Sequence, residues 1–393
     1  MTHRWLREHA RITAALGTTA LLCAPAYALR PPPPTDAPAV PAEVTDADEL
    51  VVLASSDGDV QRLRSSVVER GYAVRASYPL AGLDLVMITL TIPANVTPLE
   101  AIAEVETILP GSTAGVNHRY ELQGLDKDAD EDTNEGARAA APRRYAERMI
   151  DWLERGCTAR VVIGLLDGAI DASDDALDGI EIETKSFVDA DTDPRHATAV
   201  ASLIAGKGRL RDAALRAATV ADATGEAGVD AIVRGLDWTV SRGARVVNVA
   251  LSGPYNKILD RDFEAATGDG VAIVAAVGNE GPEVAPRYPA AFGDVLAVTA
   301  LDANAAILPD AVRGDHVSLA APGVEVWSPA GGGCYETGTS FATAFATAML
   351  AAAPDVDAAV ASILTAAEDL GAPGPDPVFG RGLAKMSPDC FGR

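Results

Sequence analysis

The stretch RVVIGLLD, residues 160–167, is an apolar run that ends in an acid. Continuous apolar runs of this kind are typical of parallel strands buried on both faces. Three more follow along the chain: ARVVNVAL (244–251), GVAIVAAVG (270–278) and DVLAVTA (294–300). Between the runs lie stretches with helical spacing: HATAVASLIAG (196–206), AGVDAIVRGLDWTVSRG (227–243) and ILDRDFEAATGDG (258–270). The alternation predicts a doubly wound α/β domain over residues 143–393, with a mainly parallel sheet and helices on both faces.

A different pattern occupies residues 48–123. Its periodicities alternate between strand and helix in the order βαββαβ, which is typical of a small α+β, ferredoxin-like unit. The expected strands are 50–54, 72–78, 83–92 and 118–122, and the expected helices are 60–71 and 97–109. The sequence therefore predicts two folded units.

The N-terminal segment 1–28 has the features of an export signal, because a basic start precedes a short apolar run and Ala26-Tyr27-Ala28 is a small-x-small cleavage site. The run is too short for a stable membrane span. A retained anchor, or a lipid anchor at Cys23, is the alternative. A Pro-rich spacer (29–47) follows, and an acidic flexible linker is expected at 124–142. We expect an exported protein, periplasmic or secreted.

Composition limits the function classes. The chain has 393 residues, of which 32 are basic and 56 acidic, so its formal net charge is −24. This excess argues against nucleic-acid partners, because phosphate binding needs Lys and Arg to displace counterions. Four cysteines are present, and removal of the signal with Cys23 leaves three. One disulfide at most can then form within the chain, and the sequence does not choose among the three pairings of Cys157, Cys334 and Cys390.

No cofactor or metal is predicted. The acidic run in the linker fails the calcium-loop pattern, because Thr133 stands where a glycine is needed. The loop DADTD (189–193) is a weaker candidate for structural calcium, with a plain surface loop as the alternative. His118 and His316 have no catalytic neighbours in the sequence and are interpreted as structural.

Three reactive side chains lie at the ends of expected elements. Asp167 directly follows a buried strand, His196 begins a helix, and Ser340 lies where the Gly-Thr turn of TGTSFATAFATAML (337–350) leads into an apolar helix. Ligand sites of such sheets lie at the carboxyl ends of the strands. A serine there can attack a carbonyl, a histidine can take its proton, and an aspartate can orient the imidazole. Together the three residues predict nucleophilic catalysis, in the chain order that subtilisin uses.

Residues from about 160 to 386 resemble the catalytic domain of the subtilisin-like serine peptidases, the subtilases. The resemblance is carried by LLDGAID around Asp167, RHATAVASLIAG around His196 and GTSFATAFATA around Ser340. A fourth segment, AAVGNEGP, places Asn279 where the family has its oxyanion-hole asparagine. The resemblance implies a serine endopeptidase that acts on proteins or peptides through an Asp-His-Ser triad.

The segment VVNVALSGP resembles the family's strand that lines the primary specificity pocket and pairs with the substrate backbone. The residues expected to bind substrate are Leu251, Ser252, Gly253, Ala276 and Gly278. Their small size favours a large apolar substrate side chain. The basic stretch 206–220 between His196 and the next expected strand is interpreted as a solvated face or as trimmed cleft loops.

The resemblance also implies that residues 48–123 are a propeptide that assists folding and inhibits the enzyme within the same chain until it is cleaved. The edge NHRYELQ (117–123) is expected to lie in the cleft as a product-like tail. The alternative is an unrelated α+β accessory domain.

The sequence departs from the family pattern at Ala197, at Gly168-Ala169 and at Phe345, although no catalytic atom is lost. These departures raise the alternative of an impaired relative that acts as a peptide-binding or inhibitory module. An esterase of the α/β-hydrolase type is disfavoured, because that fold presents its serine in Gly-x-Ser-x-Gly and orders the triad Ser, Asp, His.

Overall fold

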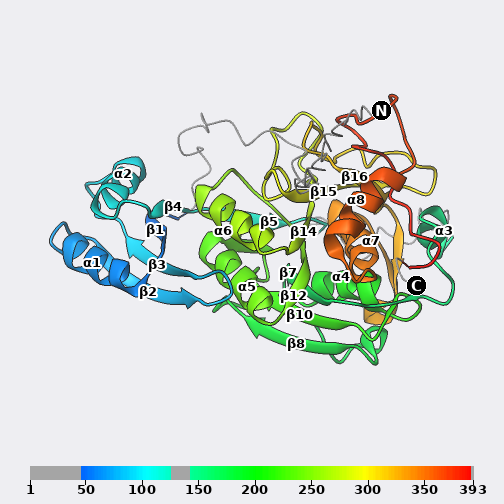
Figure 1. Ribbon diagram of the computed structural model, residues 1–393, viewed down its shortest axis with the longest axis horizontal. Coiled ribbons are helices and arrows are strands. Elements are labelled where there is room, and N and C mark those ends of the chain that lie inside the picture. The colour runs from blue at the N-terminus through cyan, green and yellow to red at the C-terminus, as the bar shows by residue number, and fades with distance from the viewer. Residues whose placement is uncertain (1–45, 125–141, 391–393) are drawn as a thin grey trace, which may run out of the picture.

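The computed structural model describes residues 46–124 and 142–390. It shows a small N-terminal unit, blue to cyan in Figure 1, beside a larger α/β unit. The predicted signal (1–28), most of the Pro-rich spacer and nearly all of the acidic linker lie outside the described residues. No helix among the described residues is long and apolar enough to cross a membrane.

The N-terminal unit has one four-stranded antiparallel sheet in the order β2-β3-β1-β4. Two helices cover it, each with a side-chain N-cap: Ser56 for the first and a capping box of Thr97 and Glu100 for the second. This is the predicted ferredoxin-like plan. The elements are β1 (Asp46–Ala54), α1 (Asp57–Val68), β2 (Ala73–Leu80), β3 (Leu85–Thr91), α2 (Pro98–Ile108) and β4 (Thr113–Asn117).

The last strand of this unit was predicted one segment too late. Its fourth strand is β4, TAGVN, whereas the segment expected at 118–122 forms β5 (Arg119–Leu122) in another sheet. The cores to which the two strands contribute explain the difference. Ala114 and Val116 pack in the small core of the N-terminal unit, while Tyr120 and Leu122 are buried in the core of the α/β unit.

The α/β unit is built on a seven-stranded sheet in the order β16-β15-β14-β12-β7-β10-β8, and every neighbouring pair is parallel. Because β7 lies inside the sheet and later strands add on both sides of it, the predicted doubly wound topology is confirmed. The strands are β7 (Val162–Asp167), β8 (Glu181–Ser186), β10 (Ala214–Thr219), β12 (Ala244–Val249), β14 (Ala272–Ala276), β15 (Val295–Leu301) and β16 (Leu319–Pro322).

The interpretation of residues 206–220 as a solvated face or cleft loops was wrong. They form β9 (Leu210–Arg211) and β10, and β10 pairs with both β7 and β8. The strand ALRAAT lacks the apolar run that marked the others. Its cation, Arg216, forms ion pairs with Glu181 and Glu183 on β8, at 2.7 and 3.4 Å.

Helices cover both faces of this sheet (Figure 1). On one face α4 (Arg195–Ala205) packs against α7 (Thr339–Ala351), and α7 also contacts β12, β14, β15 and β16. On the other face α5 (Val229–Ser241) and α6 (Lys257–Gly268) pack together. The remaining elements are α3 (Tyr145–Met149), β6 (Cys157–Thr158), η1 (Asp175–Leu177), β11 (Glu226–Gly228), β13 (Leu251–Ser252), β17 (Val326–Ser328), η2 (Ala330–Gly332), β18 (Cys334–Glu336) and α8 (Val356–Ala366).

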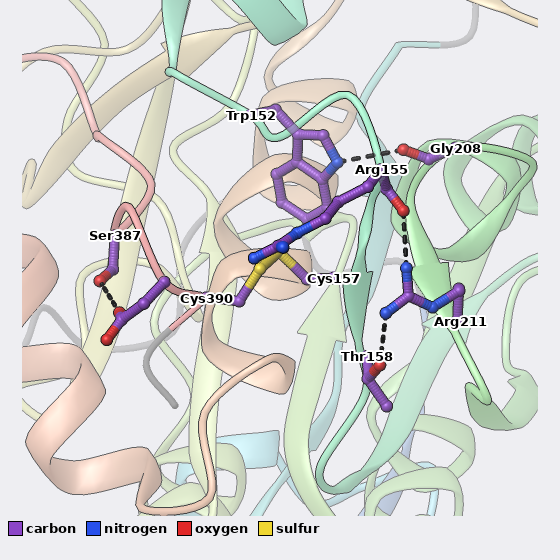
Figure 2. Close-up of a disulfide and its surroundings, with 9 residues drawn as sticks. Trp152, Arg155, Cys157, Thr158, Gly208, Arg211, Ser387 and Cys390 are labelled. Atoms are coloured by element: carbon purple, nitrogen blue, oxygen red, sulfur yellow. Dashed lines mark hydrogen bonds between the residues drawn. A yellow bond between two sulfur atoms is a disulfide. The ribbon is translucent and has the colours of Figure 1, made fainter. Parts of the chain in front are cut away.

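A disulfide joins the two ends of the α/β unit. It links Cys157 to Cys390, 233 residues apart, and so settles the pairing that the sequence left open (Figure 2). Arg211 stabilises the chain around Cys157, because its guanidinium donates to the Arg155 carbonyl at 2.7 Å and to Thr158 Oγ1 at 2.9 Å. Cys334 Sγ lies 2.8 Å from Glu336 Oε1 instead.

The N-terminal unit docks on the N-terminal ends of α5 and α6. The Asn117 amide exchanges hydrogen bonds with Asp230, donating to its carboxylate at 3.1 Å and accepting from its backbone N–H at 3.2 Å. Lys257 Nζ lies 2.5 Å from Glu106 Oε1. The Asn256 side chain donates to the Val116 carbonyl at 2.9 Å. Helix N-termini favour acceptors and negative charge, which suits this arrangement.

Candidate active site

Asp167 is the last residue of β7 and is completely buried. The residue directly after the neighbouring strand β10 holds its backbone, because Val220 N donates to the Asp167 carbonyl at 2.9 Å. One carboxylate oxygen accepts a hydrogen bond from Gly168 N at 2.6 Å. The acid is therefore fixed at the carboxyl edge of the sheet, where the sequence placed it.

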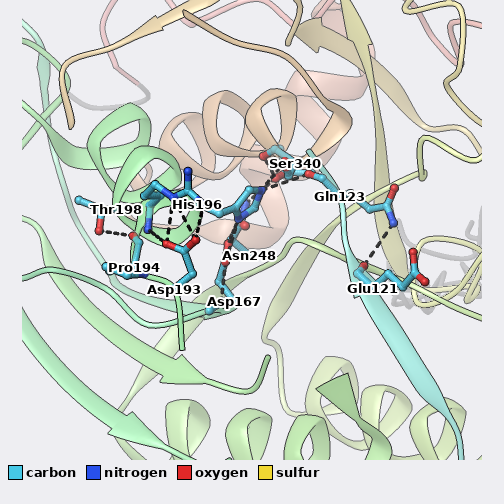
Figure 3. Close-up of polar contacts among 12 residues, drawn as sticks. Glu121, Gln123, Asp167, Asp193, Pro194, His196, Thr198, Asn248 and Ser340 are labelled. Carbon is cyan, nitrogen blue, oxygen red and sulfur yellow. Dashed lines mark hydrogen bonds and ion pairs between the residues drawn. The ribbon is translucent and has the colours of Figure 1, made fainter. Parts of the chain in front are cut away.

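His196 lies in the first turn of α4, with its ring against Asp167. Its Nδ1 is 2.8 and 3.0 Å from the two Asp167 carboxylate oxygens (Figure 3). The Phe341 ring covers one side of the imidazole, with the ring centroids 5.2 Å apart. Because Nδ1 faces a carboxylate, it carries a proton, which leaves Nε2 as the reactive nitrogen.

Ser340 is the second residue of α7 and is completely buried. Its Oγ lies 2.9 Å from His196 Nε2 (Figure 3). The structure therefore gathers Asp167, His196 and Ser340 into one hydrogen-bonded line at the sheet edge. Such a line can transfer a proton from the hydroxyl to the imidazole.

The electrostatics of His196 favour its protonated form. Burial alone lowers the pKa of the imidazole, but the charge of Asp167 and the hydrogen bond to it oppose this effect. The carbonyl of Gln123, 3.1 Å from Nε2, acts in the same direction as Asp167. The net result is a pKa raised above the usual value for histidine.

Asn279 lies beside the nucleophile. Its side-chain oxygen accepts a hydrogen bond from Thr339 N, at 3.1 Å, at the start of α7. The oxygen is thereby occupied, and the amide nitrogen lies on the side of Gly338, where an added methyl group would be 3.3 Å from it. The amide is thus placed next to the first turn of the Ser340 helix.

Two polar contacts that the sequence reasoning missed hold the catalytic elements in place. Asn248 on β12 is completely buried and donates to Thr343 Oγ1 at 2.9 Å and to Thr347 Oγ1 at 2.8 Å, which ties α7 to the sheet. Thr198 on α4 accepts from Asp171 N at 2.9 Å and so ties that helix to the loop after β7. The Asn in ARVVNVAL was the available signal, because an amide inside a buried apolar strand needs a polar partner.

The departures from the family pattern do not displace the triad. At Gly168 an added Cβ would lie 3.0 Å from the Asp193 carbonyl, so the absence of a side chain suits the close approach of the two loops. Ala197 is completely buried. Phe345 lies in the core, where the Arg209 guanidinium stacks 4.9 Å from its ring centroid.

Strand β5 leads to the triad, because the residue that follows it, Gln123, places its carbonyl 3.1 Å from His196 Nε2. It lies between β11 and β13 and pairs antiparallel with both. In this pairing Leu251 is opposite Leu122 and Ser252 is opposite Glu121. Two of the expected substrate-binding residues therefore form main-chain pairs with β5 of the same chain.

Of the other expected substrate-binding residues, Gly253 contacts a side chain of β5, whereas the contacts described for Gly278 and Ala276 are with other parts of the α/β unit. Gly253 lies against the Tyr120 ring, which a methyl group there would overlap. Gly278 has a positive φ of 107°, and a methyl group there would meet the Glu280 carboxylate. Ala276 is buried within the sheet, opposite Val298.

The chain after β5 runs to His196 and Ser340. Gln123 donates its backbone N–H to the Ala250 carbonyl at 2.9 Å, and its own carbonyl faces His196 Nε2. At Gly124, where φ is +120°, an added Cβ would lie 2.7 Å from Ser340 Oγ. The peptide between Gln123 and Gly124 thus lies beside Ser340 Oγ and His196 Nε2.

The side chain that lies beside the expected substrate-binding residues is that of Gln123, which is polar. Gln123 places its amide next to Glu280 and Asn279, and Arg287 forms an ion pair with Glu280 at 3.1 Å. The segment that the structure places there thus carries a polar side chain, while the expectation of a large apolar side chain stays a prediction for other substrates. The small residues leave volume for a long side chain, but the Glu280–Arg287 ion pair makes the surroundings of that side chain polar.

Other candidates from the sequence lie elsewhere. His118 is at the junction of the two units, 3.0 Å from Asn256, and burial lowers its pKa. His316 is buried in the α/β unit. Among the residues that the structure describes, no group of three or more His, Cys, Asp or Glu side chains is arranged to hold a metal ion.

Comparison with known proteins identifies the family. The model of the Subtilase family matches residues 158–382, which is more than half of the chain. This chain belongs to the subtilase family. It is 31% identical over 240 residues to the minor extracellular protease Epr of Bacillus subtilis (strain 168), a match that covers 57% of this chain and 37% of Epr.

Subtilisin E of the same organism is 31% identical over 203 residues, which are 47% of this chain and 53% of subtilisin E. The chain thus spans about half or less of the length of these relatives. The crystal structure of fervidolysin from Fervidobacterium pennivorans, a keratinolytic enzyme related to subtilisin, matches with a TM-score of 0.71 and 21% identity. That match covers 91% of this chain and 62% of fervidolysin, and it shows the shared fold.

Proposed function

We propose that this protein is a serine endopeptidase made as a zymogen. The observation that carries the proposal is the continuous line from the Asp167 carboxylate through the His196 imidazole to Ser340 Oγ, with distances of 2.8 and 2.9 Å. Membership of the subtilase family supports it. The substrates are proteins or peptides that bind in extended form between β11 and β13, where β5 lies.

Acylation uses each of these groups once. Ser340 Oγ bonds to the carbonyl carbon of the substrate while its proton passes to His196 Nε2, and Asp167 stabilises the imidazolium. The negative charge on the carbonyl oxygen is stabilised by the Asn279 side-chain amide and the Ser340 backbone N–H. The C–N bond then breaks, and His196 returns the proton to the leaving amine.

Deacylation repeats the sequence with water. His196 takes a proton from a water molecule as the water oxygen bonds to the acyl carbon. The ester bond to Ser340 Oγ breaks, the proton returns to that oxygen, and the product leaves as a carboxylic acid. No atom or electron is required beyond the peptide and one water molecule.

The segment 48–123 is, in this proposal, the propeptide, and its first substrate bond is Gln123–Gly124. Support comes from the placement of that bond at Ser340 and from the pairing of β5 with β11 and β13. After cleavage, the ferredoxin-like unit stays docked on α5 and α6 through contacts such as those of Asn117 with Asp230. It thereby keeps the cleft filled and inhibits the enzyme until it is removed.

Export is part of the same proposal. It is supported by the signal-like residues 1–28 and by the disulfide between Cys157 and Cys390, since disulfides persist in oxidising compartments. The protein then works in the periplasm or outside the cell.

A fluorophosphonate probe tests the activity. Matured protein should be labelled on the peptide that contains Ser340 and should hydrolyse a peptide substrate, while Ser340→Ala should do neither. Ser362→Ala makes the same Ser-to-Ala change at an exposed residue of α8 and is the matched control that keeps labelling. Binding of peptides by the wild type without labelling or hydrolysis would contradict the proposal and favour the peptide-binding module.

A further inference from the structure

The Gln123 residue is only 4% exposed, and its side chain lies among Asn279, Glu280 and Arg287; we call this surrounding the Gln123 pocket. Asn279 N donates to Gln123 Oε1 at 2.7 Å. The amide nitrogen donates to the Glu121 carbonyl at 3.2 Å and lies 3.5 Å from Glu280 Oε1. Both ends of this amide therefore meet partners of the matching kind.

The charges around this pocket are balanced. The Glu280 carboxylate accepts hydrogen bonds from Ser252 Oγ and from Arg287 Nε. The side chains of Arg287 and Glu280 are 19% and 24% exposed, so the ion pair is largely shielded from water. The other Glu280 oxygen, Oε2, is buried and has no hydrogen-bond partner among the described residues. The pocket thus offers one backbone donor and a carboxylate acceptor within a neutral pair.

We infer that this pocket selects glutamine immediately before the bond that is cleaved. The inference rests on the proposed peptidase function and names its substrate class. A neutral amide satisfies Asn279 N with its oxygen and faces Glu280 with its nitrogen, without changing the net charge of the pocket.

Other side chains at the position of Gln123 lose its hydrogen bond with Asn279 N, its contact with Glu280, or both. Methionine leaves the half-buried Asn279 N–H without an acceptor where the peptide excludes water, and such an unpaired donor is costly. Glutamate places a second carboxylate next to Glu280 and the Glu121 carbonyl. Lysine brings an ammonium near Arg287 and has no acceptor for Asn279 N. Phenylalanine fills the volume and makes neither hydrogen bond.

Peptides built on the chain's own Tyr-Glu-Leu-Gln-Gly (120–124) test the inference with matured wild-type protein. The Gln position is replaced by Met, Glu, Lys or Phe, and kcat/KM is measured for each. We expect Gln to be cleaved about ten- to a hundredfold better than Met or Phe, as expected when a substrate leaves a buried hydrogen-bonding group unpaired. Glu and Lys should be worse than Gln by at least about tenfold.

Two charge variants show which residues set the preference. Glu280→Gln leaves Arg287 uncompensated, so the ratio of kcat/KM for Gln over Glu peptides should fall by about tenfold or more. Arg287→Ala leaves Glu280 uncompensated, and the Gln over Lys ratio should fall similarly. Glu283→Gln, at an exposed residue four positions before Arg287, makes the same charge change outside the pocket and should leave both ratios unchanged.

The outcomes separate this inference from the proposed function. If Ser340 is labelled by the fluorophosphonate and the Phe or Met peptide is cleaved as well as the Gln peptide, the selectivity is wrong and the peptidase stands. Equal ratios in Glu280→Gln, Arg287→Ala and Glu283→Gln would also overturn the assignment of the pocket. If Ser340 is not labelled and no peptide is cleaved, the peptidase function itself fails.

Discussion

At the scale of single residues, the His196 imidazole is the most closely surrounded reactive group. Asp167 lies on one nitrogen, while Ser340 and the Gln123 carbonyl share the other at 2.9 and 3.1 Å. The Gln123 carbonyl needs a proton on Nε2 for its hydrogen bond, whereas Ser340 needs Nε2 without a proton. A filled cleft therefore favours the protonated ring, and deprotonation favours attack by the serine.

The raised pKa of His196 predicts the pH dependence of turnover. Only the neutral imidazole accepts the serine proton, so kcat should fall as the pH drops through the raised pKa of the occupied site. The inflection of kcat for a peptide substrate should lie above pH 6.5, the ordinary value for histidine. Steady-state kinetics between pH 5 and about 9 measures it. An inflection at or below the ordinary value would contradict the assignment of Asp167 as the partner that raises it.

The side chain of Asn279 is expected to affect turnover independently of the His196 protonation state. Asn279→Ala should lower kcat by about 10²–10³ with a smaller change in KM, because its amide acts on the charge of the transition state; the magnitude is that known for subtilisin. Asn304→Ala, an exposed asparagine in the loop after β15, is the control and should change neither constant. Unchanged turnover in Asn279→Ala would remove this side chain from the mechanism.

At the scale of elements, α5 and α6 carry two buried acids beneath the N-terminal unit. Asp237 accepts a hydrogen bond from Gly82 N at 2.7 Å, but both carboxylate oxygens of Asp262 have no partner among the described residues. Burial first, and then the charge of Asp237, raise the pKa of Asp262 well above its usual value. An acid with a raised folded-state pKa destabilises the fold at pH values above its unfolded-state pKa.

We therefore expect Asp262→Asn to stabilise the protein increasingly as the pH rises above about 4, where an unfolded aspartate ionises. Each kcal/mol recovered should raise Tm by about 2–4 °C in a domain of this size. Thermal unfolding of Ser340→Ala chains with and without Asp262→Asn measures it without self-digestion. Glu264→Gln, on the exposed side of the same helix, should give a much smaller difference. An Asp262→Asn effect that shrinks as the pH rises would refute the burial argument.

Sequence patterns predicted those strands whose apolar residues match their burial in the folded protein. The apolar runs of β7, β12, β14 and β15 are buried on both faces and were recognised as parallel strands. Strand β10 was missed because ALRAAT is rich in alanine and carries Arg216, whose partners lie on β8. Strand β5 was assigned to the wrong sheet, because alternation along a strand does not reveal which core receives its side chains.

The triad of the candidate active site was predictable from the sequence, but the residues around Gln123 were not. Asp167, His196 and Ser340 lie at element ends and in distinct motifs, so their meeting at one sheet edge followed from the fold class. The roles of Gln123, Glu280 and Arg287 depend on which loop the end of β5 meets. That contact joins segments more than 150 residues apart, and no local pattern encodes it.

At the scale of the whole molecule, one strand joins the two units. The ferredoxin-like sheet ends at Asn117, and within two residues the chain enters the three-stranded sheet β11-β5-β13 of the α/β unit. The small unit is thus docked on α5 and α6 while its C-terminal end lies at Ser340. The disulfide between Cys157 and Cys390 joins β6 of the larger unit to the C-terminal end of the described residues.

The intact mass of the purified full chain tests the account most directly. Wild-type protein is expected to yield two fragments separated at Gln123–Gly124, with a new N-terminus at Gly124. Ser340→Ala, expressed and purified in the same way, is expected to retain that bond. Cleavage of the same bond in Ser340→Ala, or a wild-type chain cut only at other positions, would contradict the claim that Ser340 acts on the strand lying in its own cleft.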